Sequence, residues 1–324
     1  MANEPEILSI LDKLNQLARG RGGRFDLSVK SGDLQLHLVL GGGDETASAA
    51  AADPPSTALA KPVWNKPGHG VVAQIAQNVL ESSDPAAWQK LADIMDGDSE
   101  GRDDVITMAR WPDDAKQDQS FHNKTGGWHY VDFPFEEGQP PPDDPPAPAG
   151  DNVLTKLPGF VDAVSSANGR EQADAFAWVL HLAGDLHQPL HCATRITAAH
   201  KAPKGDGGGN AFLLGSRQNL HSLWDGLLVS DGVTSNYIQQ LAGKIQNEFP
   251  IDAFSEQDRT SLDFATWAKE SYKIAATFAY AGIEEHAHPP DAYMQKAKDI
   301  ARKRAALGGY RLAALLAAIA AKMP

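Results

Sequence analysis

The stretch His181-Leu-Ala-Gly-Asp185-Leu-His187-Gln-Pro189-Leu-His191 governs the interpretation of this chain. Apolar residues at helical spacing lead into it and predict a buried helix over 170–187. His181 and Asp185 stand four residues apart and therefore project from one face of that helix, whereas Pro189 ends or kinks the helix and re-aims His191. Imidazole and carboxylate groups gathered in this way suit zinc. The alternative is a core histidine satisfied by a neighbouring carboxylate.

A second segment, Asn219-Leu-His221-Ser-Leu-Trp-Asp225, repeats the His-x-x-x-Asp spacing on another expected helix. Packing alone explains two such pairs poorly, because a buried carboxylate without a cation or donors costs several kcal/mol. The repeat therefore favours a metal site. Two further motifs place a ligand type beside a large aromatic residue: Trp111-Pro-Asp113 and Trp128-His129-Tyr-Val-Asp132.

Composition limits the class of protein. The chain has 324 residues, 42% of them hydrophobic and 22% charged, which is ordinary for a globular protein. The single cysteine, Cys192, excludes an intramolecular disulfide and a cysteine-rich zinc finger. A formal net charge of −13 argues against a basic surface that binds duplex nucleic acid, but it does not exclude contact with phosphates through bound metal.

Neither a membrane span nor a signal peptide is evident in the sequence. The most apolar stretch, 312–321, is rich in alanine and too short to cross a bilayer, so we expect no membrane insertion. Residues 1–30 lack a basic start followed by an apolar core and a small-residue cleavage site.

The pattern predicts three parts. Residues 1–40 read as a small module of unknown function, with a helix over 6–18 and a β-hairpin that turns at 31–33. Residues 41–62 read as a flexible linker, and 63–324 as an all-α main body with its chemistry at helix ends and on loops. Residues 134–148, with seven prolines, are expected to be an irregular surface loop, and 201–210 another. Helices are expected at 69–81, 86–94, 159–166, 170–187, 219–228, 236–248, 261–280 and 291–322.

The order of motifs resembles a known family. From Trp64-Asn-Lys-Pro-Gly-His69 the chain continues through the motifs above, a Gly-Gly-Asn210 segment and Asn-Leu-His-x-x-Trp-Asp. This order is similar to that of the zinc-dependent single-strand nucleases and 3′-nucleotidases of the nuclease S-one/P-one type. The resemblance covers about residues 63–322 and implies a helical domain of the phospholipase C/nuclease type with three zinc ions in one cleft.

The resemblance also implies which residues bind the metal. One zinc would take Asp113, His129, His181 and Asp185, and Asp185 would bridge to a second. The bridged ion would take His69 and the α-amino and carbonyl groups of Trp64. The remaining ion would be held by the last three ligands: His191, His221 and Asp225.

Trp64 departs from the family pattern. Family members are secreted or periplasmic, and removal of their signal peptide frees the tryptophan amine, whereas Trp64 follows 63 residues without a recognisable signal. Proteolysis before Trp64, a zinc ion bound by fewer groups, and an unusual fusion are three ways to account for this.

The expected reaction is hydrolysis of single-stranded DNA and RNA and of 3′-nucleotides to products that carry 5′-phosphates. Zinc lowers the pKa of water toward ~7, which would provide hydroxide at neutral pH. We expect Asp132 to orient that water and Lys116 to neutralise phosphate charge. Tyr130 is a candidate to stack on a base, which requires an unpaired strand. Asn210 is expected to bind either a ligand histidine or the substrate. The alternative for Asp132 is an ordinary helix-end or loop carboxylate, for Lys116 a solvated surface lysine, and for Tyr130 packing in the core.

The remaining candidates receive simpler roles. His187 would point away from the metal face and is expected to be structural, and Cys192 is expected to be a buried thiol. Five histidines without a partner pattern are expected at the surface: His37, His122, His200, His286 and His288.

Two other functions fit parts of the pattern. A zinc-dependent phospholipase C would share the fold and the zinc site but would need an apolar rim that faces lipid, whereas the long loops here are polar and rich in proline. A catalytically inactive zinc-binding scaffold is opposed by the presence of all nine proposed ligands.

Overall fold

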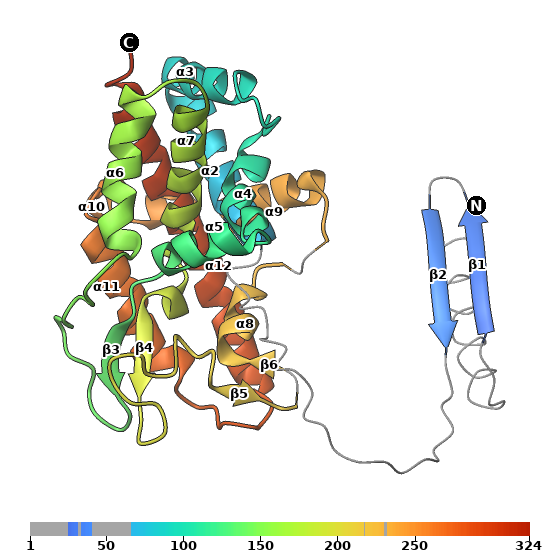
Figure 1. Ribbon diagram of the computed structural model, residues 1–324, viewed down its shortest axis with the longest axis vertical. Coiled ribbons are helices and arrows are strands. Elements are labelled where there is room, and N and C mark those ends of the chain that lie inside the picture. The colour runs from blue at the N-terminus through green and yellow to red at the C-terminus, as the bar shows by residue number, and fades with distance from the viewer. Residues whose placement is uncertain (1–24, 32–33, 41–65, 217, 230–231) are drawn as a thin grey trace. The chain divides into compact units, whose positions relative to one another are not determined.

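The computed structural model describes residues 25–31, 34–40, 66–216, 218–229 and 232–324 (Figure 1). Contacts divide the chain into two units, Met1–Leu59 and Ala60–Pro324. In the first unit, strands β1 (Phe25–Ser31) and β2 (Leu34–Leu40) pair antiparallel, as predicted for the hairpin. The predicted helix at 6–18, the linker at 41–62 and Trp64 lie outside the described residues.

The second unit is mostly helical, which confirms the expected all-α class. Its strands form two small sheets, and its elements follow in this order: α2 (Lys66–Ser83), α3 (Pro85–Asp96), α4 (Val105–Ala115), α5 (Gln119–Thr125), η1 (Gly126–His129), β3 (Phe133–Glu136), α6 (Val153–Ser166), α7 (Gly169–Asp185), η2 (Pro189–His191), β4 (Ala193–Ile196), β5 (Leu213–Leu214), β6 (Gln218–Asn219), α8 (Leu220–Asp225), α9 (Ser235–Glu248), η3 (Ile251–Ala253), α10 (Glu256–Thr260), α11 (Phe264–Ile274), η4 (Ala275–Ala279) and α12 (Asp291–Ala320).

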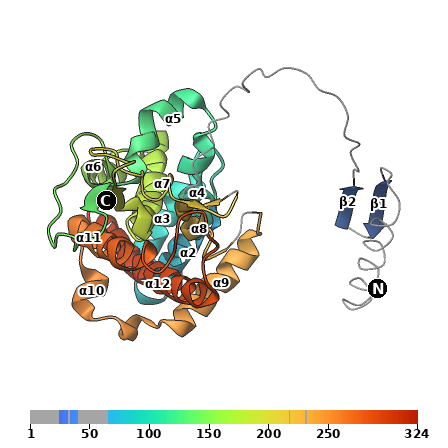
Figure 2. The same ribbon diagram turned by 90° about the horizontal axis from the view of Figure 1, so that it is seen from below.

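Helix α7 lies in the middle of this unit and packs against α2, α4, α6 and α12 (Figures 1 and 2). Every residue from Ala175 to Asp185 is buried, so the helix is covered on all sides. A helix that is surrounded in this way holds its last turn firmly in the core. That last turn carries His181 and Asp185.

Helices α2 and α12 pack closely along their lengths. Val71, Val72 and Ile75 on α2 are fully buried. Gly309 on α12 faces them, and a Cβ at this position would overlap the side chain of Ile75. The glycine therefore allows the two backbones to approach, and this contact fixes the first turn of α2, where His69 lies.

Three α-helices were not expected from the sequence: α4, α5 and α10. Helix α4 contains Pro112, which cannot donate a backbone hydrogen bond. The helix forms because Asp104 caps its start by accepting from Thr107 N at 2.7 Å and because one face is buried. The short helix α5 begins in the same way at Asp118, whose carboxylate accepts from Ser120 N and Phe121 N.

The proline-rich segment 134–148 was predicted to be irregular throughout, and its first residues are an exception. Phe133–Glu136 forms strand β3, which pairs in parallel with β4. Pro134 is tolerated because this sheet has only two strands, so one edge of each strand needs no partner.

Other predicted helices are present with shifted ends. Helix α6 begins at Val153 because Asn152 and Thr155 form a capping box. The segment predicted as one helix over 261–280 begins at Phe264 and continues as a π-helical turn over Ala275–Ala279. Within the described residues, no helix has the length and apolar character needed to cross a bilayer.

The contribution of the α6 cap to stability can be measured directly. Asn152 is buried and accepts from Leu154 N and Thr155 N, whereas Asn168 holds the equivalent position before α7 without a side-chain cap bond. We expect Asn152→Ala to lower the free energy of unfolding by about 1 kcal/mol more than Asn168→Ala does. Urea unfolding followed by circular dichroism measures both, and equal losses would contradict the assigned cap.

Candidate metal centre

Buried histidines and aspartates meet where several elements end. His69 lies in the first turn of α2, and Asp113 lies near the end of α4. His129 ends η1, and His191 ends η2. The other four come from α7 and α8, two from each helix: His181, Asp185, His221 and Asp225. The eight residues are all less than a tenth exposed.

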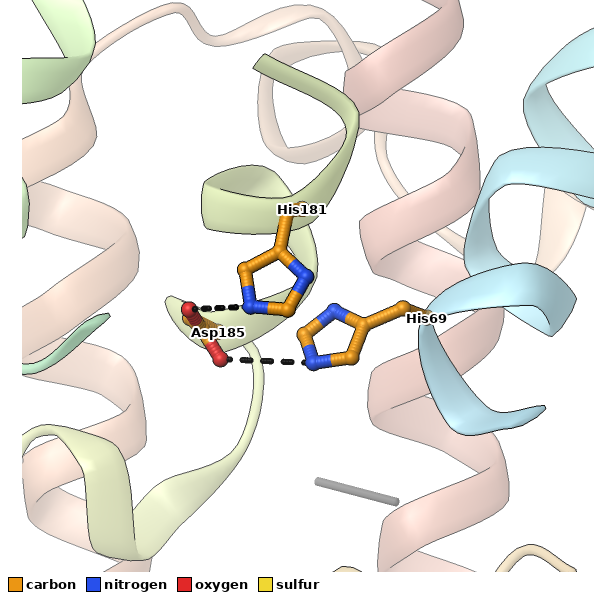
Figure 3. A group of neighbouring side chains, drawn as sticks. All are labelled: His69, His181 and Asp185. Carbon is orange, nitrogen blue, oxygen red and sulfur yellow. Dashed lines mark ion pairs between the residues drawn. The ribbon is translucent and has the colours of Figure 1, made fainter. Parts of the chain in front are cut away.

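Asp185 is the centre of this arrangement. One carboxylate oxygen lies 3.5 Å from His69 Nε2 and 2.9 Å from His191 Nδ1. The other lies 3.1 Å from His129 Nδ1 and 3.3 Å from His181 Nε2. Figure 3 shows His69 and His181 reaching the two oxygens from α2 and α7. A single carboxylate therefore joins four imidazoles that come from four different segments.

The side chains form three groups whose ligand atoms lie within 4.8 Å of one another. One group contains the three residues that the resemblance assigned to one ion, whereas the other two groups share His181, and Asp185 is grouped with His69 and His181. The three groups are His69, His181 and Asp185; Asp113, His129 and His181; and His191, His221 and Asp225.

Backbone carbonyls orient several of the rings. His181 Nδ1 donates to Ala109 O at 2.7 Å, and His221 Nδ1 donates to Gly208 O at 2.7 Å. A proton held on Nδ1 leaves Nε2 as the atom with a free lone pair. In His181 that atom faces Asp113 and Asp185, and in His221 it faces Asp225 at 3.5 Å.

The surroundings determine the charge of these histidines. Burial lowers the pKa of His69 to about 3, with a further contribution from His181, and lowers the pKa of His181 to about 4. Burial also lowers the pKa of His129 well below its ordinary value. Burial acts in the same sense on His191, but Asp185 outweighs it and raises the pKa of His191 to about 10. Three rings are therefore neutral at pH 7, whereas Asp185 favours a proton on His191.

The donor set fits a divalent cation. Asp113 Oδ2, Asp225 Oδ2 and His191 Nε2 are buried without a hydrogen-bond partner among the described residues. Such atoms are costly in a dry core unless they have a partner. Imidazole nitrogens and carboxylate oxygens are ligands that zinc binds readily, so each of the three groups could hold a metal ion.

A cavity of about 110 Å³ opens onto these groups, and His129, His191 and His221 form part of its wall. All four residues expected to act on substrate also line it: Lys116, Tyr130, Asp132 and Asn210. Asp132 and Tyr130 are partly exposed there. Lys116 Nζ lies 2.9 Å from Asp113 Oδ1, and Asn210 donates its side-chain amide to Gly207 O at 2.8 Å.

Two residues of the cavity were not foreseen. His122 was expected at the surface, but it lines the cavity because it lies on the unpredicted helix α5. Lys204 reaches the cavity from the loop before Asn210. Neither residue belongs to a spaced motif, so sequence spacing offered no signal for them.

His187 and Cys192 lie apart from the metal groups. His187 Nδ1 donates to Ala183 O at 2.8 Å, and the ring packs against Trp267. The Cys192 thiol is fully buried and donates to Leu186 O, and burial raises its pKa well above the ordinary value. Both findings agree with the structural roles expected for these residues.

Comparison with known proteins assigns the helical unit to a family. The family model for the S1/P1 nuclease matches residues 64–321. Endonuclease 4 of Arabidopsis thaliana is 26% identical over 81% of this chain and 90% of its own length. Nuclease S1 of Aspergillus oryzae is 25% identical over 80% and 92%, and Nuclease P1 of Penicillium citrinum 25% over 77% and 95%. With a family model matched over most of its length, the chain belongs to the S1/P1 nuclease family.

Proposed function

We propose that this protein is a zinc-dependent nuclease that hydrolyses single-stranded DNA and RNA to products with 5′-phosphates. It also releases inorganic phosphate from the 3′-phosphomonoesters of nucleotides. The proposal rests mainly on one observation: three buried His/Asp groups, two of which share His181, adjoin a cavity that is also lined by Lys116 and Asp132. The names of the relatives, endonuclease and nuclease, support the same reaction class. By analogy with the family, we place the protein outside the cell or in the periplasm.

In this proposal the metal ligands are those that the resemblance implied. Asp113, His129, His181 and Asp185 would hold one zinc ion, and His191, His221 and Asp225 another. A third would be held by His69, Asp185 and Trp64. Bound zinc polarises phosphate oxygens and makes water nucleophilic at neutral pH. His and Asp in this proportion favour zinc over magnesium or calcium, which prefer oxygen ligands throughout.

The chain's own residues prepare the substrate and the water. Asp132 lies three residues after His129 and lines the same cavity, so its carboxylate accepts a hydrogen bond from the attacking water and orients it. Lys116 stays beside Asp113 and contributes positive charge where the phosphate sits. Water between these groups is confined, since the cavity holds about 110 Å³.

A preference for single strands would follow from stacking of a base on Tyr130. Tyr130 lines the cavity, and a base can stack on its ring only when that base is unpaired. Asn210 lines the same wall, where its amide carbonyl is available to a base edge. In a duplex the bases face one another, so no base is free to stack on this ring.

The test is an assay of the full chain on single-stranded DNA, RNA, duplex DNA, 3′-AMP and phosphatidylcholine. We expect cleavage of the first two and of 3′-AMP, products with 5′-phosphates, loss of activity with a chelator and recovery with zinc. Cleavage of phosphatidylcholine instead would show a phospholipase C. Tight zinc binding without activity on any substrate would show a scaffold.

The variant Asp132→Asn should lower the rate of hydrolysis without changing the amount of metal bound. We expect kcat on single-stranded DNA to fall by about 10²-fold or more, because the amide cannot accept the proton or orient the water as a carboxylate does. Metal content should stay as in the parent protein. The control is Asp151→Asn, since that carboxylate is well exposed and pairs with Lys156. Unchanged turnover in Asp132→Asn would remove this residue from the mechanism.

The metal content of the protein should depend on which of two aspartates is substituted. Asp185 contacts four histidines, whereas Asp225 lies near His191 and His221. We expect Asp225→Asn to lose about one zinc ion per chain and Asp185→Asn to lose about two or more, because ligand loss weakens each ion that the residue shares. Mass spectrometry of dialysed protein measures this. Equal losses would contradict the shared role of Asp185.

A further inference from the structure

A second hollow adjoins the cavity over the metal groups. It has a volume of about 410 Å³ and is formed by the loop over residues 199–211. Lys204, Gly207 and Asn210 line both spaces. A ligand that fills the first cavity can therefore continue into the second without crossing a helix.

The charged groups of this hollow are two lysines and one carboxylate that already has hydrogen-bond partners. Lys201 and Lys204 are exposed, and His200 is partly exposed. Among the described residues, no ion pair engages the side chain of any of the three. Asp206 is buried beneath them, and its carboxylate accepts from Tyr280 OH at 3.0 Å and from the backbone. The hollow thus presents positive charge to the solvent.

The carboxylate of Asp206 accepts hydrogen bonds from groups within the protein. Its Oδ1 accepts from Arg195 N at 3.1 Å and from Gly209 N at 3.1 Å. The Arg195 guanidinium lies over the rings of Phe212 and Tyr280 and 3.6 Å from the other oxygen. Arg195 also pairs with Glu137 at 2.9 Å, and among the described residues neither Asp206 nor Glu137 forms an ion pair with the two lysines.

The loop that carries the lysines is anchored on both sides. Thr194 Oγ1 donates to Lys204 O at 2.8 Å and accepts from Gly207 N at 3.1 Å. Gly205 has a φ of +58°, and a Cβ at this position would overlap Thr194 Oγ1. The backbone at Lys204 is thereby held against strand β4, which places this residue at the wall of the cavity.

Lys116 and Lys204 differ in a way that matters for substrate. Lys116 lies 2.9 Å from the carboxylate of Asp113 and serves the reacting phosphate in the proposed function. Lys204 has no carboxylate partner among the described residues, and it extends the positive charge away from the metal groups toward Lys201. The arrangement matches a chain of phosphates rather than a single one.

We propose that Lys201 and Lys204, assisted by His200, bind the phosphodiester that neighbours the one being cleaved. The inference rests on the proposed function and specifies its substrate: a strand of two or more phosphates gains this contact, and a 3′-nucleotide, with its one phosphate on the metal groups, does not. Because the chain carries a net charge of −13, local cations are needed to hold a polyanion here.

The experiment compares the double variant Lys201→Ala/Lys204→Ala with Lys296→Ala/Lys298→Ala. Lys296 and Lys298 are exposed on α12 and line neither hollow, so the control removes the same charge elsewhere. For each full-length holoenzyme, kcat/KM is measured on a single-stranded oligonucleotide and on 3′-AMP over a series of salt concentrations.

We expect the Lys201/Lys204 variant to lose about 10-fold or more in kcat/KM on the oligonucleotide at low salt, through KM, and to keep its value on 3′-AMP. The slope of log kcat/KM against log salt should become shallower by about 0.7 for each phosphate contact removed. Lys201→Arg/Lys204→Arg should restore both values, because the charge is retained. The control variant should match the parent protein on both substrates.

Equal losses on both substrates, or an unchanged salt slope, would overturn the subsite. Failure of the proposed function has a different signature, since the parent protein would then cleave neither substrate. In that event, fluorescence anisotropy with the labelled oligonucleotide decides the subsite alone: loss of binding in the alanine variant, but not in the control, supports it, and equal binding refutes it.

Discussion

A buried carboxylate surrounded by four imidazoles is the constraint on which this structure depends. Asp185 is fully buried, and its oxygens lie 2.9–3.5 Å from rings that belong to α2, η1, α7 and η2. A charge in that position is stable only with compensating charge around it. The surrounding packing, from the all-buried α7 to the close contact of α2 with α12, keeps these five side chains in place.

The outer parts of the site follow from the same constraint. Carbonyl groups of Ala109 and Gly208 hold the protons of His181 and His221, so the opposite nitrogens face the carboxylates. The loop that contains Gly208 is in turn anchored by Asp206 and Thr194. Helix α4 and strand β4 are far apart in the sequence, yet both help to orient ligand rings. Ala109 on α4 does so directly, and Thr194 on β4 does so through the loop that contains Gly208.

Spacing predicted the site better than it predicted the elements that carry it. His181 with Asp185, and His221 with Asp225, could be paired from sequence because i,i+4 spacing places both on one helical face. Helix α4 could not be predicted in this way, because Pro112 argues against a helix. The cap and the buried face that stabilise this helix are seen only in the folded structure. Lys204 was missed for a similar reason: its position depends on hydrogen bonds to Thr194, ten residues away, and not on any periodicity.

The spread of the ligands along the chain has a consequence for biogenesis. The groups combine residues from His69 to Asp225, so almost half of the polypeptide separates the first contributor from the last. During synthesis the ribosome must release α8 before the last group is complete, and long-range closure of this kind is slow. Because His221 and Asp225 lie on α8, their group can bind a metal ion only after that helix has been synthesised and has packed beside His191.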